Sequence, residues 1–195
     1  MIAIAVLDDH PAVRTGLERL VERAAGLAPV ACVGHQDELW PRLDAGRVDV
    51  VVVDYDLARG DGLSVCLRLK ERARPPRVIV YSAYAGPGLA VGARVAGADA
   101  LVSKSEPVAV LLETIRHVAA GRTALPPLAP DVRQAALGRV EDDDVAVAAM
   151  LPAGTAHADV AEALSLSARD VAGRARRIVA RLRPTAAPAA VTQAI

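Results

Sequence analysis

The chain has 195 residues, 53% of which are apolar, and its 23 basic and 23 acidic side chains leave a formal net charge of zero at pH 7. This length allows one large domain or two small ones, and the apolar content is ample for buried cores. No stretch approaches the roughly 18 consecutive apolar residues of a membrane span, and no basic region precedes an apolar run at the N-terminus. We therefore expect a globular cytoplasmic protein without a membrane partner.

Five apolar runs that are rich in β-branched residues alternate with helical patterns in the first part of the chain. They are Ile2–Leu7, Val30–Gly34, Val48–Val53, Arg77–Tyr81 and Ala100–Val102. The third run ends in four consecutive valines, which is typical of a strand that helices cover on both faces. We therefore predict an α/β fold with a five-stranded, doubly wound parallel sheet.

Helical patterns separate these runs. The segments that begin at Pro11 and Pro107 each repeat apolar residues at the spacing of one helix face, and proline suits the first turn of a helix. The segment Ala85–Ala96 has weaker helix propensity because it contains Pro87 and three glycines. We predict two amphipathic helices that pack on the sheet and a short or mobile helix at 85–96.

The helical pattern stops after Gly121, where three prolines within Thr123–Pro130 discourage regular structure. We predict a linker at 121–140 that separates a domain at 1–120 from a second domain at 141–195. The second domain contains three helical patterns of roughly a dozen, eight and fifteen residues. It is therefore predicted to be a small all-α module.

Polar side chains follow four of the five predicted strands. Asp8 and Asp9 close the first strand, Asp54 closes the third, Ser82 closes the fourth, and Lys104 follows the fifth. We expect these side chains to lie close together, because the loops at the carboxyl ends of parallel strands converge on one edge of the sheet. Three clustered carboxylates repel one another unless a divalent cation lies among them, and Mg²⁺ prefers oxygen ligands. A lysine and a hydroxyl opposite them suit further anionic oxygens, so the set predicts phosphoryl transfer with Asp54 as the nucleophile.

These residues and their neighbours resemble the receiver domains of NarL/FixJ-type response regulators, over about residues 1–120. The matching segments are Asp8-Asp9-His10-Pro11, Asp54 with Asp61-Gly62, Tyr81-Ser82-Ala83 and Gly97–Lys104. The resemblance implies a flavodoxin-like receiver with the strand order 2-1-3-4-5, in which Asp54 is the phosphoacceptor. It also implies a sensor histidine kinase as partner and no enzymatic activity beyond assistance to the domain's own phosphotransfer and dephosphorylation.

The resemblance further implies a magnesium site next to the phosphoacceptor. Asp9 and Asp54 would ligate Mg²⁺ with their carboxylates, and Asp56 would contribute its backbone carbonyl. Asp8 would assist the metal through water. The cofactor predicted for this chain is therefore Mg²⁺.

By the same resemblance, Ser82 and Lys104 would hold the phosphoryl oxygens. Three positions depart from the family pattern. Leu101 stands where the family usually has an aromatic side chain that moves inward on activation, so the switch is altered there. Ala58 replaces a usual proline, and Asp56 adds a carboxylate side chain that could alter the lifetime of the phosphorylated state.

The segment Gly154–Ser167 has the helix, tight turn and helix layout of a helix-turn-helix motif, and Ser167 suits the N-cap of the second helix. In that second helix, Val171 and the apolar residues on the same face as far as Leu182 predict a buried stripe. The segment resembles the LuxR-type DNA-binding domain, over about residues 141–195. The resemblance implies double-stranded DNA as a partner and a homodimer as the binding form.

Arginine is concentrated in this second helix: residues 165–183 contain six arginines and one aspartate. Arginine suits DNA phosphates and guanine edges. The predicted DNA contacts are Arg169, Ala172, Gly173, Arg174, Arg176, Arg177 and Arg181. Base readout is expected to be reduced or different, because Ala172 and Gly173 replace side chains that often contact bases in the family. The acidic run Glu141–Asp144 either favours the helix that it precedes or reaches back to the arginines and masks them.

The main prediction is a DNA-binding transcription factor that phosphorylation of Asp54 controls. One alternative is a regulator that uses the same fold without phosphate, through protein contacts or a small ligand; Leu101 and the weak helix at 85–96 leave this open. Another alternative is a haloacid-dehalogenase-type phosphatase, because Asp54-Tyr55-Asp56 resembles the opening motif of that family. That motif usually follows the first strand, whereas here it follows the third. This alternative also gives Asp8 and Asp9 no role.

Overall fold

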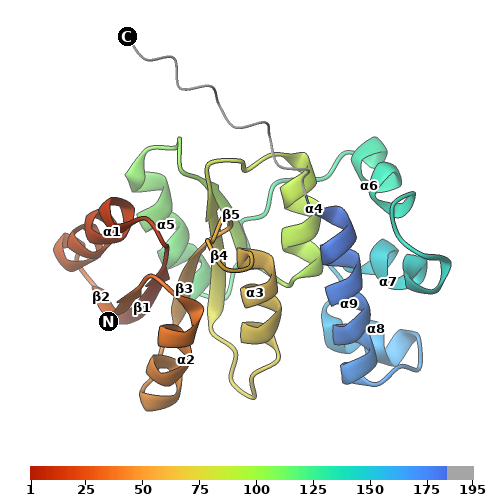
Figure 1. Cartoon of the computed structure of the whole chain (residues 1–195), viewed down its shortest axis with the longest axis horizontal. Helices are drawn as coiled ribbons and strands as arrows, with labels where there is room; N and C mark the ends of the chain where they lie inside the picture. Colours follow the sequence, from red (N-terminus) through yellow and green to blue (C-terminus); the bar gives the residue numbers. More distant parts are fainter. Residues whose placement is uncertain (184–195) are drawn as a thin grey trace, which may run out of the picture.

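The structure is a computed structural model, and it describes residues 1–183. Its elements are β1 (Ile2–Leu7), α1 (Pro11–Arg23), β2 (Leu27–Val33), α2 (Gln36–Ala45), β3 (Val50–Asp54), α3 (Gly62–Lys70), β4 (Arg77–Ser82), α4 (Pro87–Val95), β5 (Ala100–Ser103), α5 (Val108–Ala119), α6 (Pro130–Leu137), the short 3₁₀ helix η1 (Asp142–Asp144), α7 (Val145–Met150), α8 (His157–Ala163) and α9 (Ala168–Leu182). Strands and helices alternate as far as α5 and build an α/β domain, and a helical module follows it (Figure 1).

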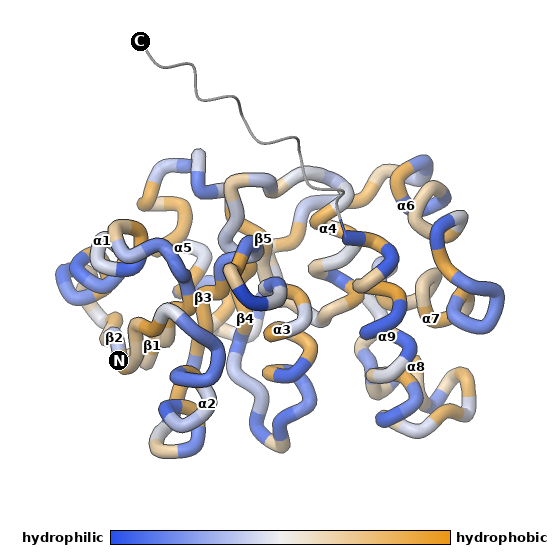
Figure 2. Tube along the Cα trace, viewed as in Figure 1, coloured by the Kyte–Doolittle hydropathy of each residue, from blue (hydrophilic) through white to orange (hydrophobic). Residues whose placement is uncertain are grey.

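The five strands form one parallel sheet in the order β2-β1-β3-β4-β5, which confirms the predicted fold. Helices α1 and α5 pack on one face of this sheet, and α2, α3 and α4 pack on the other (Figure 1). Every residue of the central strand β3 is buried, as the run of valines predicts. Hydrophobic segments accordingly follow the strands in Figure 2.

Strand β2 begins at Leu27, before the predicted start at Val30. Pro29 lies inside it, and an edge strand tolerates a proline because its missing N–H is not needed for pairing. The register shifts at this point: Ile4 pairs with Pro29 and Ala5 pairs with Ala31, so Val30 is skipped and remains exposed. The proline therefore causes a local irregularity and does not end the strand.

The predicted short helix at 85–96 is α4, and its small side chains allow close packing. A Cβ atom at Gly92 would lie 2.7 Å from the Cδ1 atom of Leu63 in α3, so glycine permits the approach of these two helices. The predicted linker at 121–140 is not irregular throughout, because α6 lies within it and packs on α4. Pro130 occupies the first turn of α6, where a proline starts a helix without disrupting it.

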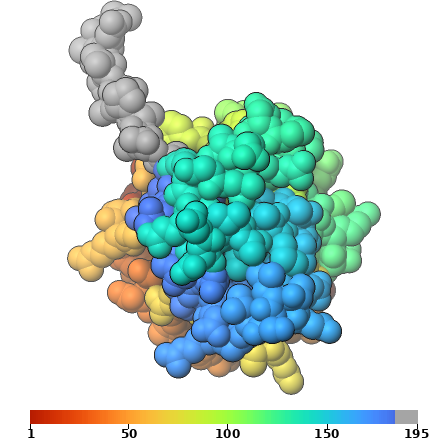
Figure 3. All heavy atoms as spheres, turned by 90° about the vertical axis from the view of Figure 1, so that its right-hand side faces the viewer, coloured from red at the N-terminus to blue at the C-terminus, as the bar shows by residue number. Residues whose placement is uncertain are grey.

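The helical module packs directly on the α/β domain. Helix α9 lies against α3 and α4, and its apolar residues share one buried cluster with theirs (Figure 1). Figure 3 views the molecule from this side, where the module covers the α/β domain. None of the helices within residues 1–183 combines the length and the apolar character that a membrane crossing needs.

The helix-turn-helix layout is present as predicted, with α8 and α9 joined by a tight turn. Ser165 adopts a left-handed conformation in this turn, with a φ angle of 52°. Ser167 caps α9 through a reciprocal capping box with Asp170, in which each side chain accepts a backbone N–H from the other residue. The predicted stripe is buried, from Val171 to Leu182.

Candidate functional site

The acidic residues predicted to form a site do meet at the carboxyl edge of the sheet. Strands β1 and β3 are neighbours in a register that pairs Leu7 with Val53, so the residues that follow them lie side by side. The side chains of Asp8 and Asp54 are only 1% and 2% exposed, whereas that of Asp9 is 18% exposed. Two carboxylates are thus almost fully withdrawn from water at one point.

Lys104 compensates part of this buried negative charge. Its Nζ atom lies 2.8 Å from Oδ2 of Asp54 and 2.8 Å from Oδ2 of Asp8. Burial raises the pKa of Asp54, and the nearby Lys104 ammonium opposes that rise. Burial works against the charged form of Lys104 as well, but the two carboxylates raise its pKa. We therefore treat Lys104 as fully charged and attached to both acids.

Ser82 lies on β4, which is next to β3, and Leu101 lies on β5, the edge strand beyond β4. Ser82 ends β4, is 1% exposed, and accepts a hydrogen bond on Oγ from the backbone N–H of Tyr84 at 3.0 Å. Its carbonyl accepts the backbone N–H of Lys104 at 2.8 Å, which ties the ends of β4 and β5 together. Leu101 is buried in β5. The structure therefore brings Ser82 to the edge that holds the acids, and it places Leu101 behind that edge.

The donor set fits a hard divalent cation. Ligand atoms of Asp8, Asp9, His10 and Asp54 all lie within 4.8 Å of one another. Oδ1 of Asp9 and Oδ2 of Asp54 are buried and lie 2.9 Å from Nδ1 of His10 and 2.8 Å from Nζ of Lys104. Three carboxylates that share one ammonium retain net negative charge, and carboxylate oxygens are the ligands that Mg²⁺ prefers. The backbone N–H of Asp56 donates to Oδ1 of Asp54 at 3.3 Å, and its own carboxylate is in the exposed loop.

His10 is a member of this cluster that the sequence reasoning did not assign a role. Its Nδ1 atom lies 2.9 Å from Oδ1 of Asp9 and 3.4 Å from Oδ1 of Asp8. Its position directly after the acidic pair was the available signal. The side chain is 64% exposed, so it covers the mouth of the site and is not part of the buried core.

Helix α3 begins against the phosphoacceptor position. A Cβ atom at Gly62 would lie 2.3 Å from the carbonyl oxygen of Asp54, so only glycine allows this approach. Asp61 caps the helix: its Oδ1 accepts the backbone N–H of Ser64 at 2.9 Å. The guanidinium of Arg183, which follows α9, donates to the other oxygen of Asp61. The resemblance included Asp61 and Gly62, but the contact between Asp61 and the helical module had no sequence signal.

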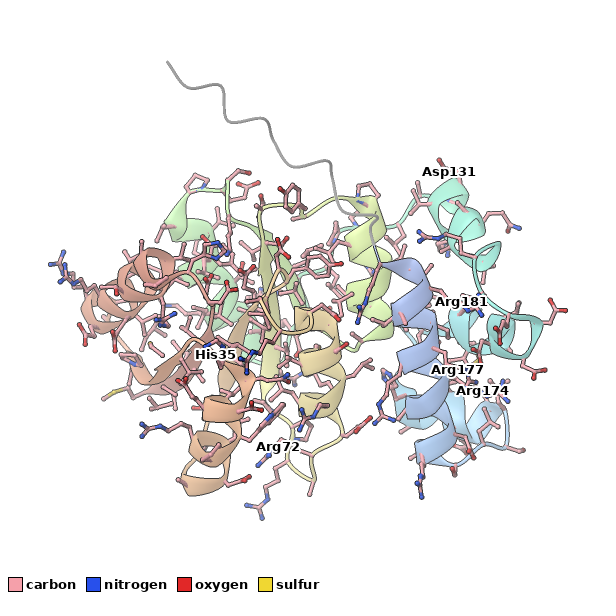
Figure 4. The ribbon with its side chains drawn as sticks, viewed as in Figure 1. His35, Arg72, Asp131, Arg174, Arg177 and Arg181 are labelled. Atoms are coloured by element: carbon pink, nitrogen blue, oxygen red, sulfur yellow. The ribbon has the colours of Figure 1, made fainter. Side chains whose placement is uncertain are left out.

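Three of the arginines that were predicted to contact DNA form hydrogen bonds or ion pairs with the acidic run Glu141–Asp144. Arg177 forms two hydrogen bonds to the buried carboxylate of Asp144, at 3.0 and 2.7 Å. Arg181 contacts Glu141, and Arg174 contacts both the backbone of Asp143 and the Asp144 carboxylate. Figure 4 shows Arg174, Arg177 and Arg181 on the side of α9 that faces away from the sheet. Of the two roles left open for these acids, the structure shows that they reach back to the arginines.

Of the four remaining predicted DNA contacts, three meet the α/β domain or line the cleft beside it. Arg176 is half exposed and forms an ion pair with Glu71 at the end of α3. Arg169 and Ala172 line a cleft between the two domains. Gly173 is partly buried, with open space where a Cβ atom would stand. The basic surface predicted for DNA is therefore largely occupied by contacts within the chain.

Comparisons with known proteins place this geometry in a family context. The family model described as the response regulator receiver domain matches residues 4–116. The chain is 30% identical to the transcriptional activator protein ExaE of Pseudomonas putida over 181 residues, which cover 87% of this chain and 85% of that protein. It is 28% identical to the DNA-binding transcriptional activator DevR/DosR of Mycobacterium tuberculosis over 192 residues, with coverages of 93% and 88%.

Solved structures show the same likeness. A LuxR-family two-component response regulator from Aurantimonas matches with a TM-score of 0.59 and 32% identity, and the match covers 68% of this chain and 92% of that chain. RcsB from Salmonella enterica serovar Typhimurium, bound to the promoter P1flhDC, matches with a TM-score of 0.61 over 93% of this chain and 91% of that chain. Its identity is 17%, so this second match describes the fold alone.

Proposed function

Since this chain belongs to the response regulators, whose receiver domain its residues 4–116 match, we propose that it is a DNA-binding transcription regulator controlled by phosphorylation of Asp54. The proposed phosphoryl donor is a sensor histidine kinase. Relatives that are named as transcriptional activators support the role at DNA. We propose that the protein acts in the cytoplasm, where the DNA is. We also propose a homodimer, because paired half-sites on DNA suit a two-fold symmetric protein. Because residues 4–116 match the receiver family, we do not propose the haloacid-dehalogenase-type phosphatase activity.

In the proposed reaction, a carboxylate oxygen of Asp54 forms a bond to phosphorus while the bond from phosphorus to the histidine nitrogen of the kinase breaks. The residues that would hold Mg²⁺ are Asp9 and Asp54 with their carboxylates, Asp56 with its backbone carbonyl, and Asp8 through water. When bound, Mg²⁺ neutralises the charge on the transferring oxygens. The receiver supplies the acceptor and the surrounding charges, and it turns over no separate substrate.

Lys104 and Ser82 are proposed to bind the phosphoryl oxygens. The phosphoryl group adds close to two negative charges next to an ammonium that already lies between Asp54 and Asp8. Lys104 can then exchange a carboxylate partner for a phosphoryl oxygen. The Ser82 hydroxyl can donate to a second one, because Oγ only accepts in its bond with Tyr84.

One observation carries this proposal: the single Lys104 ammonium lies 2.8 Å from both Asp54 and Asp8 at a buried edge where the Asp9 carboxylate is a third acid of the same cluster. A structural ion pair at a strand end needs only one acid, whereas this arrangement leaves negative charge that one ammonium does not neutralise. The direct test is incubation with Mg²⁺ and acetyl phosphate, followed by intact-mass measurement. We expect one added phosphoryl group, its loss in Asp54→Ala, and its retention in the control Asp131→Asn, which changes an exposed acid of α6. Equal phosphorylation of Asp54→Ala would overturn the assignment.

The contact between the domains supports a closed resting form. Arg169, Ala172 and Arg176 border the α/β domain, so this domain and a DNA duplex compete for the same face of α9. We propose that phosphorylation of Asp54 weakens this contact and releases α9. DNA affinity measured by fluorescence anisotropy should therefore rise in the presence of acetyl phosphate. An affinity that does not respond to phosphorylation would instead favour the phosphate-independent regulator.

A further inference from the structure

A cleft of about 900 Å³ lies between the α/β domain and the helical module. Its walls come from α3, α4, the start of the linker, α8 and α9. Small residues create the space, because Gly97, Ala98, Ala168 and Ala172 line it. Sites for small molecules have volumes of roughly 300–1,000 Å³, so this cleft is large enough for a ligand. Leucines supply apolar wall: Leu67, Leu125 and Leu151.

The charged side chains around the cleft are not balanced. Four are cationic and two are acidic: Lys70, Arg94, Arg169 and Arg176 against Glu71 and Asp99. The Lys70 ammonium lies 2.5 Å from the Asp99 carboxylate, and Arg176 pairs with Glu71. Both acids are thus already committed to partners. The positive charges of Arg94 and Arg169 therefore remain without a salt bridge.

Neither Arg94 nor Arg169 forms a salt bridge within residues 1–183, and Asp170, the acid next to Arg169 in sequence, is hydrogen-bonded to Ser167 in the capping box. Arg94 donates from Nη2 to the carbonyl oxygens of Leu125 at 3.4 Å and Pro126 at 2.9 Å, which are neutral acceptors. Its Nε atom is buried and has no hydrogen-bond partner among residues 1–183. Burial lowers the pKa of Arg94, which shows that its charged form is poorly solvated. An anion next to it would supply the missing interaction.

We propose that this cleft binds a small organic anion whose acidic group is held by Arg94 and Arg169 and whose apolar body lies against the leucine and alanine walls. Arg94 belongs to α4 and Arg169 belongs to α9, so the ligand bridges the two domains. It therefore stabilises the closed form, and it covers the face of α9 that would meet DNA. This last consequence rests on the proposed function, whereas the binding itself does not.

The probe for the test is 8-anilinonaphthalene-1-sulfonate, which joins a sulfonate to an aromatic body and becomes fluorescent in apolar sites. Titration of the full chain should show saturable binding of one probe per chain. The double variant Arg94→Gln/Arg169→Gln should bind about tenfold more weakly or worse, because two charged contacts are lost. The matched control Arg19→Gln/Arg59→Gln removes the same charge from exposed positions outside the cleft and should bind as the parent does.

A second variant tests the position of the probe without changing any charge. Ala172→Leu narrows the cleft beside Arg169 and should weaken saturable binding, while urea denaturation shows that the fold persists. Inorganic sulfate should compete only weakly, because it lacks the apolar body. Binding as tight as that of the parent in Ala172→Leu or in the double arginine variant, or no saturable binding at all, would overturn the proposal. None of these outcomes bears on phosphorylation of Asp54, which is measured separately.

Discussion

The ion pair between Arg176 and Glu71 offers a test of the closed form from the side of the α/β domain. Replacing Glu71 with lysine removes an attraction and brings two cations together. The two side chains are 50% and 36% exposed, so we assign about 0.5–1 kcal/mol to the lost attraction and a similar amount to the new repulsion. The total of about 1–2 kcal/mol corresponds to a shift of about 5–30-fold from the closed toward the open form.

The assay is fluorescence anisotropy of a labelled DNA duplex with the unphosphorylated protein at one fixed salt concentration. Apparent affinity scales with the fraction of open protein, so Glu71→Lys should strengthen binding by up to the same factor. The control is Glu113→Lys on α5, which adds the same charge at an exposed residue with no ion pair among residues 1–183. It accounts for the general attraction of an added lysine to DNA. Equal affinities of the two variants would refute the closed-form reasoning.

Three further predictions concern the phosphoacceptor, the acidic run and the domain contact. Gly62→Ala should destabilise the fold by about 1–3 kcal/mol in urea and slow phosphate uptake, because its Cβ would lie 2.3 Å from the Asp54 carbonyl oxygen. Asp144→Asn should cost about 2–3 kcal/mol, less than a fully buried pair, because Arg177 is 53% exposed. Burial lowers the pKa of His157, so stability is full above its unfolded pKa of about 6.5 and falls as pH decreases below it. His157→Gln should flatten that dependence in thermal unfolding measured between pH values of about 5 and 8.

Each of these variants has a matched control in the same chain. Gly16→Ala places a methyl group where no atom lies within 4 Å, so it should not destabilise. Asp142→Asn changes the same charge in an exposed residue of the acidic run. His35→Gln removes an exposed histidine whose side chain makes no capping hydrogen bond. A control that changes as much as its variant would contradict the corresponding argument.

The sheet and the acidic cluster were predictable because both follow from local sequence. Buried parallel strands require continuous apolar runs, and their carboxyl ends must meet at one edge. Asp8, Asp54 and Lys104 therefore came together as expected. The start of β2 was missed because Pro29 argues against a strand unless the strand is known to lie at an edge, and strand order is a tertiary property.

The fate of the arginines in α9 was not predictable in the same way. Their number and spacing favour a basic surface, and the sequence gives no sign of which acids lie opposite. Glu141 and Asp144 reach them because α7, which follows this acidic run, packs alongside α9, and Glu71 does so because α9 packs on α3. Charge content is local, whereas the pairing of charges depends on packing between distant segments.

Helix α3 also accounts for how a signal could pass from Asp54 when residue 101 is a leucine. The N-terminus of α3 touches the backbone of Asp54 through Gly62, and Asp61 at that end binds Arg183. The C-terminal end of α3 binds α9 a second time, through Glu71. A displacement of α3 by a phosphoryl group would therefore act on both attachments of α9 at once. This route needs no inward movement of an aromatic side chain in β5, so the leucine there is compatible with control of α9 by phosphorylation.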